Sequence, residues 1–437
     1  MASNSAIAPA YLVTDPHDGK SYEILERLGE GTFSVVYRAK CTVAAASGSS
    51  NRRKSRKRDM NEMNSRVNIY KDHTKSTVVA LKCIHPNSSP KRILNELRFL
   101  KTLGGKNCCL PLLGGFRENC GFIAILPYFE HDDFKWYLPR LSTDLLRVYL
   151  YGLFRALEHV HSHGIIHRDV KPRNYLFSIS KRKGLLIDFG LAQGPEEWQT
   201  FLGDDYEWDG SKIIRKATSS GSIRNSDECQ ADVDMSGAEN VDPSRPKKRG
   251  RVRRANNVKP SNGFKSKQST KKVRAERAGT HGFRAPEVLF MSLEQTPSID
   301  IWSAGIVLLS LLSSRYPIFP KPETSQISSD AQAIAQIEAL LGRQALERAA
   351  AACKKHLVET PGDKANLAKP PSMQALCTQG RQAFYDAVLK GEGVAPLDIF
   401  PDSVYDLLER CLEVVPNKRI TAEEALNHPF FKDNVVV

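Results

Sequence analysis

The stretch from His167 to Gly190 reads HRDVKPRNYLFSISKRKGLLIDFG and constrains this chain more than any other feature of its sequence. Asp169, Lys171 and Asn174 follow one another closely, and a second acid, Asp188, comes after the short apolar run LLI. This spacing predicts two loops, each carrying one carboxylate.

The composition indicates a globular protein of the soluble, intracellular class. With 437 residues, 41% of them hydrophobic, the chain can bury a large core, and its length corresponds to about two to three domains. No apolar run approaches the ~20 residues of a membrane span, and the opening MASNSAIAPAYL lacks the pattern of a signal peptide. The nine cysteines form no CxxC pair, so neither a zinc site nor a disulfide framework is expected.

The formal charge of +14 is concentrated in two segments, residues 41–77 and 191–279. In the second segment, residues 191–240 are acidic, whereas residues 241–279 hold 14 Lys and Arg against 2 Asp and Glu. Both segments are rich in Ser, Asn and Gly and show no apolar periodicity. They are therefore predicted to be mobile insertions between folded pieces.

The remaining sequence predicts a strand-rich lobe followed by a helical lobe. Residues 22–39 alternate apolar and polar around a glycine turn, residues 77–83 and 121–129 indicate further strands, and residues 91–102 indicate a helix. Helical spacing then dominates in the rest of the chain, at 145–162, 298–312, 331–351, 403–413 and from Thr421 onward. The predicted fold class is α+β.

Five motifs occur in order: GEGTFSVV at 29–36, VALK at 79–82, HRDVKPRN at 167–174, DFG at 188–190 and APE at 285–287. Together they resemble the motifs of a eukaryotic protein kinase, over roughly residues 22–193 and 278–431. A single motif would be weak evidence, since an Asp-Phe-Gly tripeptide alone is more often a turn than a metal site. The resemblance implies a bilobal kinase fold that uses ATP and Mg²⁺.

The resemblance also implies a role for each motif residue in phosphoryl transfer, which needs the γ-phosphate, metal ions and a hydroxyl in line. Asp188 and Asn174 would hold Mg²⁺, and Asp169 would orient the acceptor hydroxyl and take its proton. Lys82 would contact the α- and β-phosphates, paired with Glu96. The residues expected around ATP are Leu28, Gly29, Glu30, Gly31, Thr32, Phe33, Ser34, Val36, Ala80, Lys82, Glu96, Leu126 and Tyr128.

Two of these residues need comment, and two others indicate the acceptor. Ser34 replaces the third glycine of the loop, which reduces backbone freedom but leaves the phosphate-facing amides available. Leu126 is the expected neighbour of the adenine ring, although ordinary core packing explains an apolar residue there equally well. Lys171 and Thr280 resemble the serine/threonine kinase pattern, in which the lysine contacts the γ-phosphate and the threonine hydroxyl bridges acid and lysine.

A narrower resemblance is to the cell division cycle 7 kinase family, which supplies the catalytic subunit of the complex that fires replication origins. It rests on PYFEHDDF at 127–134, LIDFGLAQ at 186–193, GTHGFRAPEVL at 279–289 and SIDIWSAGIVLLSLLSSRYPIF at 298–319. Long disordered inserts within the kinase core are typical of this family. The implied division is a tail at 1–17, an N-lobe at 18–126 with an insertion at 41–77, a C-lobe at 127–432 with insertions at 194–277 and 321–391, and a tail at 433–437.

The resemblance extends to structural residues and to partners. Asp300 and Trp302 are expected to support the catalytic loop, and Arg419 to pair with Glu287. An activator subunit of the S-phase kinase would contact both lobes, and subunits of the minichromosome maintenance helicase would be substrates. Acidic or previously phosphorylated residues beside the acceptor are expected, because Arg284, together with Lys171 and Arg173, makes the cleft basic.

The basic run PKKRGRVRR at 246–254 predicts a nuclear location through an import receptor. RRKSRKR at 52–58 is a second candidate, and a nonspecific solvated charge run is the alternative for each. No membrane contact and no direct sequence-specific nucleic-acid binding are expected. A pseudokinase scaffold is disfavoured because Lys82, Asp169, Asn174 and Asp188 are all present. A cyclin-dependent or casein-kinase-2-like enzyme is disfavoured by the GFRAPE form and the long insertion.

Overall fold

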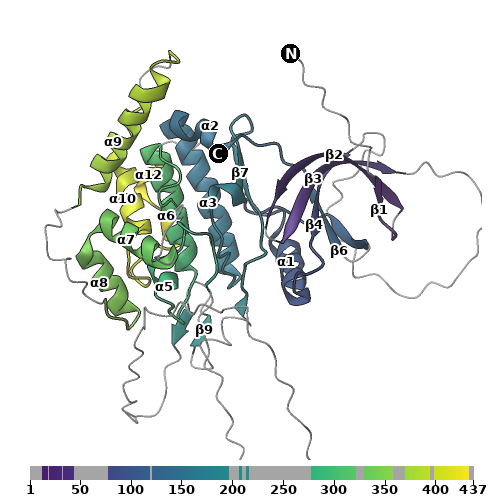
Figure 1. Cartoon of the computed structure of the whole chain (residues 1–437), viewed down its shortest axis with the longest axis horizontal. Helices are drawn as coiled ribbons and strands as arrows, with labels where there is room; N and C mark the ends of the chain where they lie inside the picture. Colours follow the sequence, from purple (N-terminus) through teal and green to yellow (C-terminus); the bar gives the residue numbers. More distant parts are fainter. Residues whose placement is uncertain are drawn as a thin grey trace, which may run out of the picture. The chain divides into compact units, whose positions relative to one another are not determined.

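The computed structural model describes residues 12–17, 19–31, 33–43, 77–118, 121–195, 206–208, 213–215, 277–320, 329–357, 370–393 and 398–432. Within these ranges the first part of the chain is a six-stranded sheet with one helix, and the later part is mostly helical (Figure 1). The predicted α+β class is therefore confirmed. None of the helices in these ranges combines the length and hydrophobicity that a membrane crossing requires.

The six-stranded sheet is antiparallel throughout, in the order β1-β2-β3-β4-β6-β5. Its strands are β1 (Leu12–Thr14), β2 (Lys20–Glu30), β3 (Ser34–Val43), β4 (Thr77–Ile84), β5 (Gly114–Glu118) and β6 (Gly121–Pro127). Helix α1 (Pro90–Leu103) begins with a proline in its first turn, where the missing N–H costs nothing, and lies beside the sheet (Figure 1).

Strand β4 carries the lysine of the VALK motif, and its alternation determines which way that lysine points. Neighbouring side chains point to opposite faces of a strand. Val79 and Leu81 are buried in the small-lobe core with Phe116. Ala80 and Lys82 consequently face the other way, where they line a cavity.

The larger lobe is built from helices around one short hairpin. The hairpin pairs β7 (Tyr175–Ser178) with β8 (Lys183–Leu186). The helical elements are α2 (Phe134–Tyr137), η1 (Leu138–Arg140), α3 (Thr143–Ser162), η2 (Pro172–Asn174), α5 (Pro286–Leu289), α6 (Ser298–Ser313), α7 (Ser329–Leu341), α8 (Arg343–Ala352), α9 (Met373–Phe384), η3 (Tyr385–Leu389), α10 (Asp402–Cys411), α11 (Ala422–Leu426) and α12 (Pro429–Lys432).

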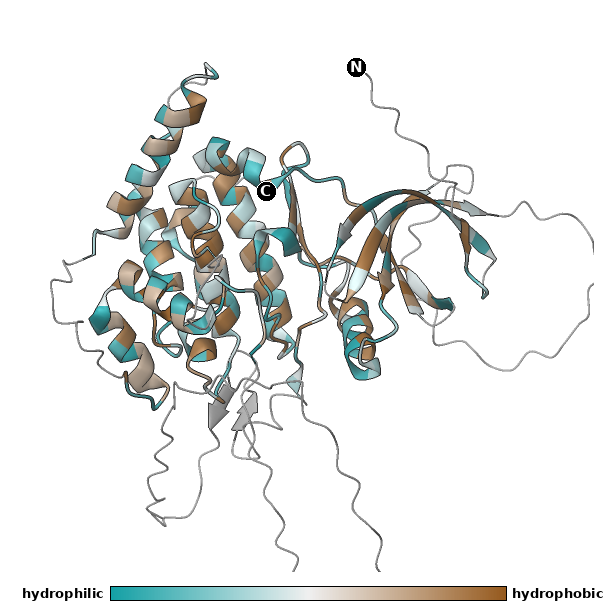
Figure 2. Cartoon of the chain, in the orientation of Figure 1, coloured by the Kyte–Doolittle hydropathy of each residue, from teal (hydrophilic) through white to brown (hydrophobic). Residues whose placement is uncertain are grey.

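Helix α6 is almost entirely buried, since every residue after its first is buried. The helices at the centre of the lobe are accordingly rich in hydrophobic residues (Figure 2). The hydroxyls of Ser303, Ser310 and Ser313 each donate to the carbonyl four residues earlier, so these polar groups are satisfied inside the helix. Such a helix can carry a functional acid into the core, and α6 carries Asp300.

Several predicted boundaries are corrected by the structure. The predicted tail at 1–17 contains β1, because buried Val13 joins the small-lobe core. Strand β3 extends to Val43 and β4 begins at Thr77, so both ends of the predicted insertion at 41–77 belong to the sheet. Residues between these strands lie outside the described part of the chain.

Two further insertions contain regular structure. The segment at 194–277 includes a short antiparallel hairpin of β9 (Tyr206–Trp208) and β10 (Ile213–Arg215). The segment at 321–391, predicted to be an insertion with helical spacing at 331–351, holds α7, α8, α9 and η3 and contributes Ile337, Leu346 and Cys377 to the core. These helices bury apolar residues against the rest of the lobe, so the helical spacing predicted at 331–351 is confirmed by α7 and α8, whereas α9 and η3 were not predicted.

Candidate active site

A cavity of about 500 Å³ lies between the glycine-rich loop, β4, α1 and β6 on one side and the HRD and DFG segments on the other. Every predicted site residue lines it except Thr32, which lies outside the described residues. The structure thus brings together predicted site residues from six separate stretches of the sequence. Several apolar wall residues were not predicted, because no motif marks them: Ile84, Leu176 and Ile187.

Lys82 is held between two carboxylates at the back of this cavity. Its Nζ lies 2.5 Å from Oε1 of Glu96 on α1 and 2.8 Å from Oδ1 of Asp188. Burial lowers the pKa of Lys82, but the two carboxylates outweigh burial and hold the pKa above its ordinary value. Burial raises the pKa of Glu96, and Lys82 counteracts this. The predicted Lys82–Glu96 ion pair is therefore formed within the chain itself.

The pKa of Asp188 is held below its ordinary value, which favours the ionised carboxylate. Burial alone would raise its pKa, but the charge of Lys82 overrides burial and brings the pKa to about 2. Its side chain is 40% exposed, so one face of the carboxylate remains open to the cavity. Asp188 also has a left-handed backbone, φ 66°, which non-glycine residues adopt mainly where the surrounding structure holds them.

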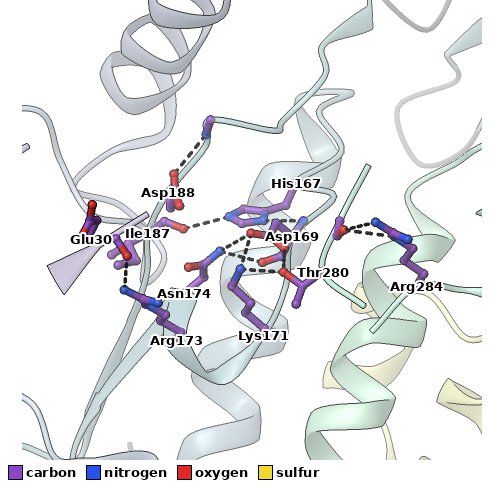
Figure 3. Close-up of polar contacts among 12 residues, drawn as sticks. Glu30, His167, Asp169, Lys171, Arg173, Asn174, Ile187, Asp188, Thr280 and Arg284 are labelled. Carbon is purple, nitrogen blue, oxygen red and sulfur yellow. Dashed lines mark hydrogen bonds and ion pairs between the residues drawn. The ribbon is translucent and has the colours of Figure 1, made fainter. Parts of the chain in front are cut away.

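The Asp169 carboxylate is surrounded by donors (Figure 3). Oδ2 accepts hydrogen bonds from Nζ of Lys171 at 2.7 Å and from Nδ2 of Asn174 at 2.9 Å, and Oδ1 accepts from the hydroxyl of Thr280 at 2.6 Å. Lys171 donates to the same Thr280 hydroxyl at 2.7 Å. The predicted bridge of acid, lysine and threonine is thus present, and it fixes the direction in which Asp169 faces.

Asn174 and Asp188 fit a divalent cation. The Nδ2 amide of Asn174 donates hydrogen bonds to the backbone carbonyl and to the carboxylate of Asp169, each at 2.9 Å. That orientation leaves the amide oxygen as the group that can face a cation. An amide oxygen and an ionised, partly exposed carboxylate are the oxygen ligands that Mg²⁺ takes together with substrate phosphates.

Buried Asp300 holds the loop that carries Asp169. Its two carboxylate oxygens accept from the backbone N–H of Arg168 and of His167, each at 2.7 Å, and from Nε2 of His161 at 2.9 Å. These bonds support Arg168 in its left-handed conformation, φ 66°. The ring of His167 in turn lies 3.0 Å from the carbonyl oxygen of Ile187, which joins the loop to the DFG segment. The predicted supporting position of Asp300 is confirmed.

The glycine-rich loop is held at both ends. The N–H of Gly31 donates to the carbonyl of Ser34 at 2.8 Å, so the serine at the third glycine position leaves the hairpin intact. The guanidinium of Arg92 on α1 lies 4.2 Å from the ring centroid of Phe33. From the opposite side of the cavity, Arg173 donates to the carbonyl of Glu30 at 2.6 Å (Figure 3). Neither arginine's contact with the loop was predicted.

The segment between the DFG and APE motifs, called the activation segment below, ends beside the loop that carries Asp169. Gly279 has φ 95°, and a Cβ there would meet the carbonyl oxygen of Arg168 at 2.8 Å, so only glycine fits. Further along, Glu287 and Arg419 form a buried two-bond ion pair, at 2.7 and 3.1 Å, as predicted. Arg168 donates to Oε1 of Gln295 at 2.9 Å, and both side chains are buried. No sequence signal pointed to Gln295.

The fold and this site define a protein kinase. The protein kinase domain family matches residues 63–208 and 262–431, which is more than half of the chain. The family match begins after the glycine-rich loop. The assignment of that loop as part of the kinase domain rests on its position in the wall of the cavity. The chain binds ATP with a divalent metal, as kinase domains do.

Relatives narrow the class further. The probable cell division control protein 7 homolog 1 of Encephalitozoon cuniculi is 33% identical over 94% of this chain and 92% of its own length. The cell cycle serine/threonine-protein kinase hsk1 of Schizosaccharomyces pombe is 33% identical over 95% of this chain and 74% of its own length. The human cell division cycle 7-related protein kinase is 27% identical over 96% and 91%, respectively. The chain therefore belongs to the cell division cycle 7 family of serine/threonine protein kinases.

Proposed function

We propose that this cell-cycle kinase transfers the γ-phosphate of ATP, bound with Mg²⁺, to serine or threonine residues in acidic sequence contexts. The observation that supports the transfer step most directly is the fixed orientation of Asp169 by Lys171, Asn174 and Thr280. A carboxylate held in this way can accept the proton of a hydroxyl that attacks the phosphate.

Different residues of the cavity would have different roles in phosphoryl transfer. Bound Mg²⁺ neutralises charge on the phosphates. Asp188 and the amide oxygen of Asn174 would hold it, while Lys82, kept charged by its two carboxylate partners, orients the α- and β-phosphates. Lys171 lies within 2.7 Å of Asp169 and would stabilise the charge that is transferred.

The acidic context follows from the charges around the acceptor position. Arg284 bonds the carbonyl of Gly279 at 2.9 Å, and Gly279 adjoins Thr280, the partner of Asp169. Arg277 precedes the same turn, and Arg173 lies on the other side of the cavity mouth. Cations placed around an acceptor serine favour neighbouring carboxylate or phosphate groups through charge-assisted hydrogen bonds.

By family membership the proposal extends to the cell. The kinase would work in the nucleus with an activator subunit of the S-phase kinase and phosphorylate the minichromosome maintenance helicase to initiate DNA replication. Both candidate nuclear import runs, at 52–58 and 246–254, lie outside the described residues. The Lys82–Glu96 ion pair is already formed within the chain. The activator would contact both lobes and keep that pair formed.

The test is phosphotransfer by the full-length chain, purified with the subunits that accompany it in its cells. Asp188→Ala should abolish transfer to helicase tails while leaving the protein folded, because the residue lies at an open cavity. Near wild-type turnover in that folded variant would contradict the assignment of the metal ligand. In a peptide array, a preference for arginine next to the acceptor would contradict the acidic context.

A further inference from the structure

The two arginines at the end of the activation segment are already occupied by an acid from a distant helix. Oδ1 of Asp330, the second residue of α7, lies 2.8 Å from Nη1 of Arg284. Oδ2 of the same carboxylate lies 3.3 Å from Nε of Arg277. One carboxylate thus bridges both guanidinium groups.

The Asp330–Arg284 half of this contact is more buried than an ordinary surface ion pair, whereas the Arg277 side chain is 60% exposed. The Asp330 side chain is 14% exposed and that of Arg284 is 21% exposed. Beside it, the hydroxyl of Ser329 lies 2.7 Å from Nδ1 of His281, so two successive residues of α7 are bonded to the segment that carries Thr280. An acid in the first turn of a helix is also favoured by the helix dipole.

The Asp330 bridge is connected to Asp169, the proposed catalytic base, through a short chain of hydrogen bonds. Arg284 bonds Gly279, and the next residue, Thr280, bonds Asp169 (Figure 3). A small cavity is lined by Asp169 and Arg284 together. An acidic residue adjoining the acceptor serine would therefore meet Arg277 and Arg284 at the place where Asp330 now lies.

We propose that Asp330 is a specificity-determining residue that competes internally with the acidic residue of the substrate. This inference rests on the proposed acidic context. Asp330 takes the charge-assisted bonds of both arginines, so an incoming carboxylate or phosphate must displace it or accept its repulsion. The strength of the Asp330 contact therefore determines how much an anionic group on the substrate can improve substrate binding through the two arginines.

The experiment compares three peptides that differ only in the residue after the acceptor serine: alanine, aspartate or phosphoserine. The wild-type kinase and Asp330→Asn, each purified in full length with its accompanying subunits, are assayed for kcat and KM at low and high salt. Glu338→Gln is the matched control, because it removes an α7 carboxylate that pairs with Arg343 away from the acceptor.

Asp330→Asn should lower KM about tenfold for the aspartate peptide and at least as much for the phosphoserine peptide, with kcat and the alanine peptide unchanged. The salt dependence of KM should become steeper, since two uncompensated guanidinium groups attract the anion. Glu338→Gln should change none of these values.

An equal change for all three peptides would show that Asp330 is only structural, and a weaker preference for acid would show that it orients the arginines for the substrate. Either result overturns the inference and leaves the proposed function in place. If neither wild type nor Asp330→Asn distinguishes the peptides, the acidic context itself is wrong, and the inference fails with it.

Discussion

The hydroxyl of Thr280 donates a 2.6 Å hydrogen bond to Oδ1 of Asp169, although 111 positions separate the two residues in the sequence. The long segment after the DFG motif therefore returns to the catalytic loop, and its last residues complete the surroundings of the base. Gly279 makes this return possible, because its left-handed backbone passes closest to the carbonyl of Arg168.

Thr280→Ala should lower kcat about 10- to 100-fold with little change in the KM for ATP, because Asp169 loses the donor to Oδ1 and part of its orientation. Thr280→Ser keeps the hydroxyl and should restore most of the activity. Steady-state kinetics with one peptide would measure both. Equal losses in the two variants would mean that the side-chain volume matters and the hydrogen bond does not.

Lys82→Met should abolish transfer and change how stability depends on pH. Without the ammonium group, burial should raise the pKa of Asp188 above its unfolded value, and it should raise further the pKa of Glu96, which burial already holds above its ordinary value in the wild type. A carboxyl group whose pKa is raised in the folded protein lowers the free energy of unfolding as the pH rises from its unfolded pKa to its folded pKa. In the wild type the pKa of Asp188 is instead lowered to about 2, so Asp188 stabilises the folded protein at every pH above its unfolded value of 3.8. The stability difference between wild type and variant should therefore grow from about pH 4 toward pH 8.

Chemical denaturation of the wild type and Lys82→Met across that range measures this difference. A constant gap at all pH values would show that the two carboxyl groups do not depend on Lys82.

Arg419→Ala should destabilise the protein by about 3–5 kcal/mol, because Glu287 would be left as an unpaired charge in the core. The double variant Glu287→Leu with Arg419→Met should recover much of that loss, since it buries no charge. Arg410→Ala, which breaks an exposed pair with Asp406, is the control and should cost less than about 1 kcal/mol. A single-variant loss no larger than that of the control would contradict the prediction.

Arg173→Ala should raise the KM for ATP about two- to fivefold, because the glycine-rich loop loses its bond to the catalytic loop at Glu30. The kcat should change little, since Asp169, Lys171 and Thr280 keep their own bonds. Arg182→Ala removes an exposed arginine that pairs with Asp144 and serves as the control. A loss confined to kcat would place Arg173 in the transfer step instead.

Deleting residues 200–270 removes β9, β10 and the basic run at 246–254. Phosphotransfer should be preserved, because the residues of the candidate active site lie outside the deletion. Nuclear import should be lost, because the basic run is absent. Specific activity is measured for the chain alone, for the chain with an activator subunit, and for the deletion with that activator. The chain alone should be weakly active. Full activity without the activator would remove the need for that subunit, and a folded but inactive deletion would make the insertion part of the catalytic machinery.

Short-range patterns predicted most of the secondary structure and the identity of the site residues. The VALK strand shows why, since strand alternation alone determines that Lys82 faces away from Val79 and Leu81. The start of a helix also depends on residues close in sequence, since Thr421 caps α11 in a capping box with Glu424. Helix α9 was not predicted, because the positions of its apolar residues are explained only by the core that it covers.

The sequence by itself therefore determined the class of enzyme and the set of groups that line the candidate active site, because those groups lie in motifs with fixed local spacing. Only the tertiary structure decided that Asp330 lies on Arg277 and Arg284, that Gln295 meets Arg168, and that Arg173 reaches Glu30. These partners lie 46 to 143 positions apart, or belong to a segment taken for an insertion. Their meeting depends on how whole elements pack, and no local spacing encodes that packing.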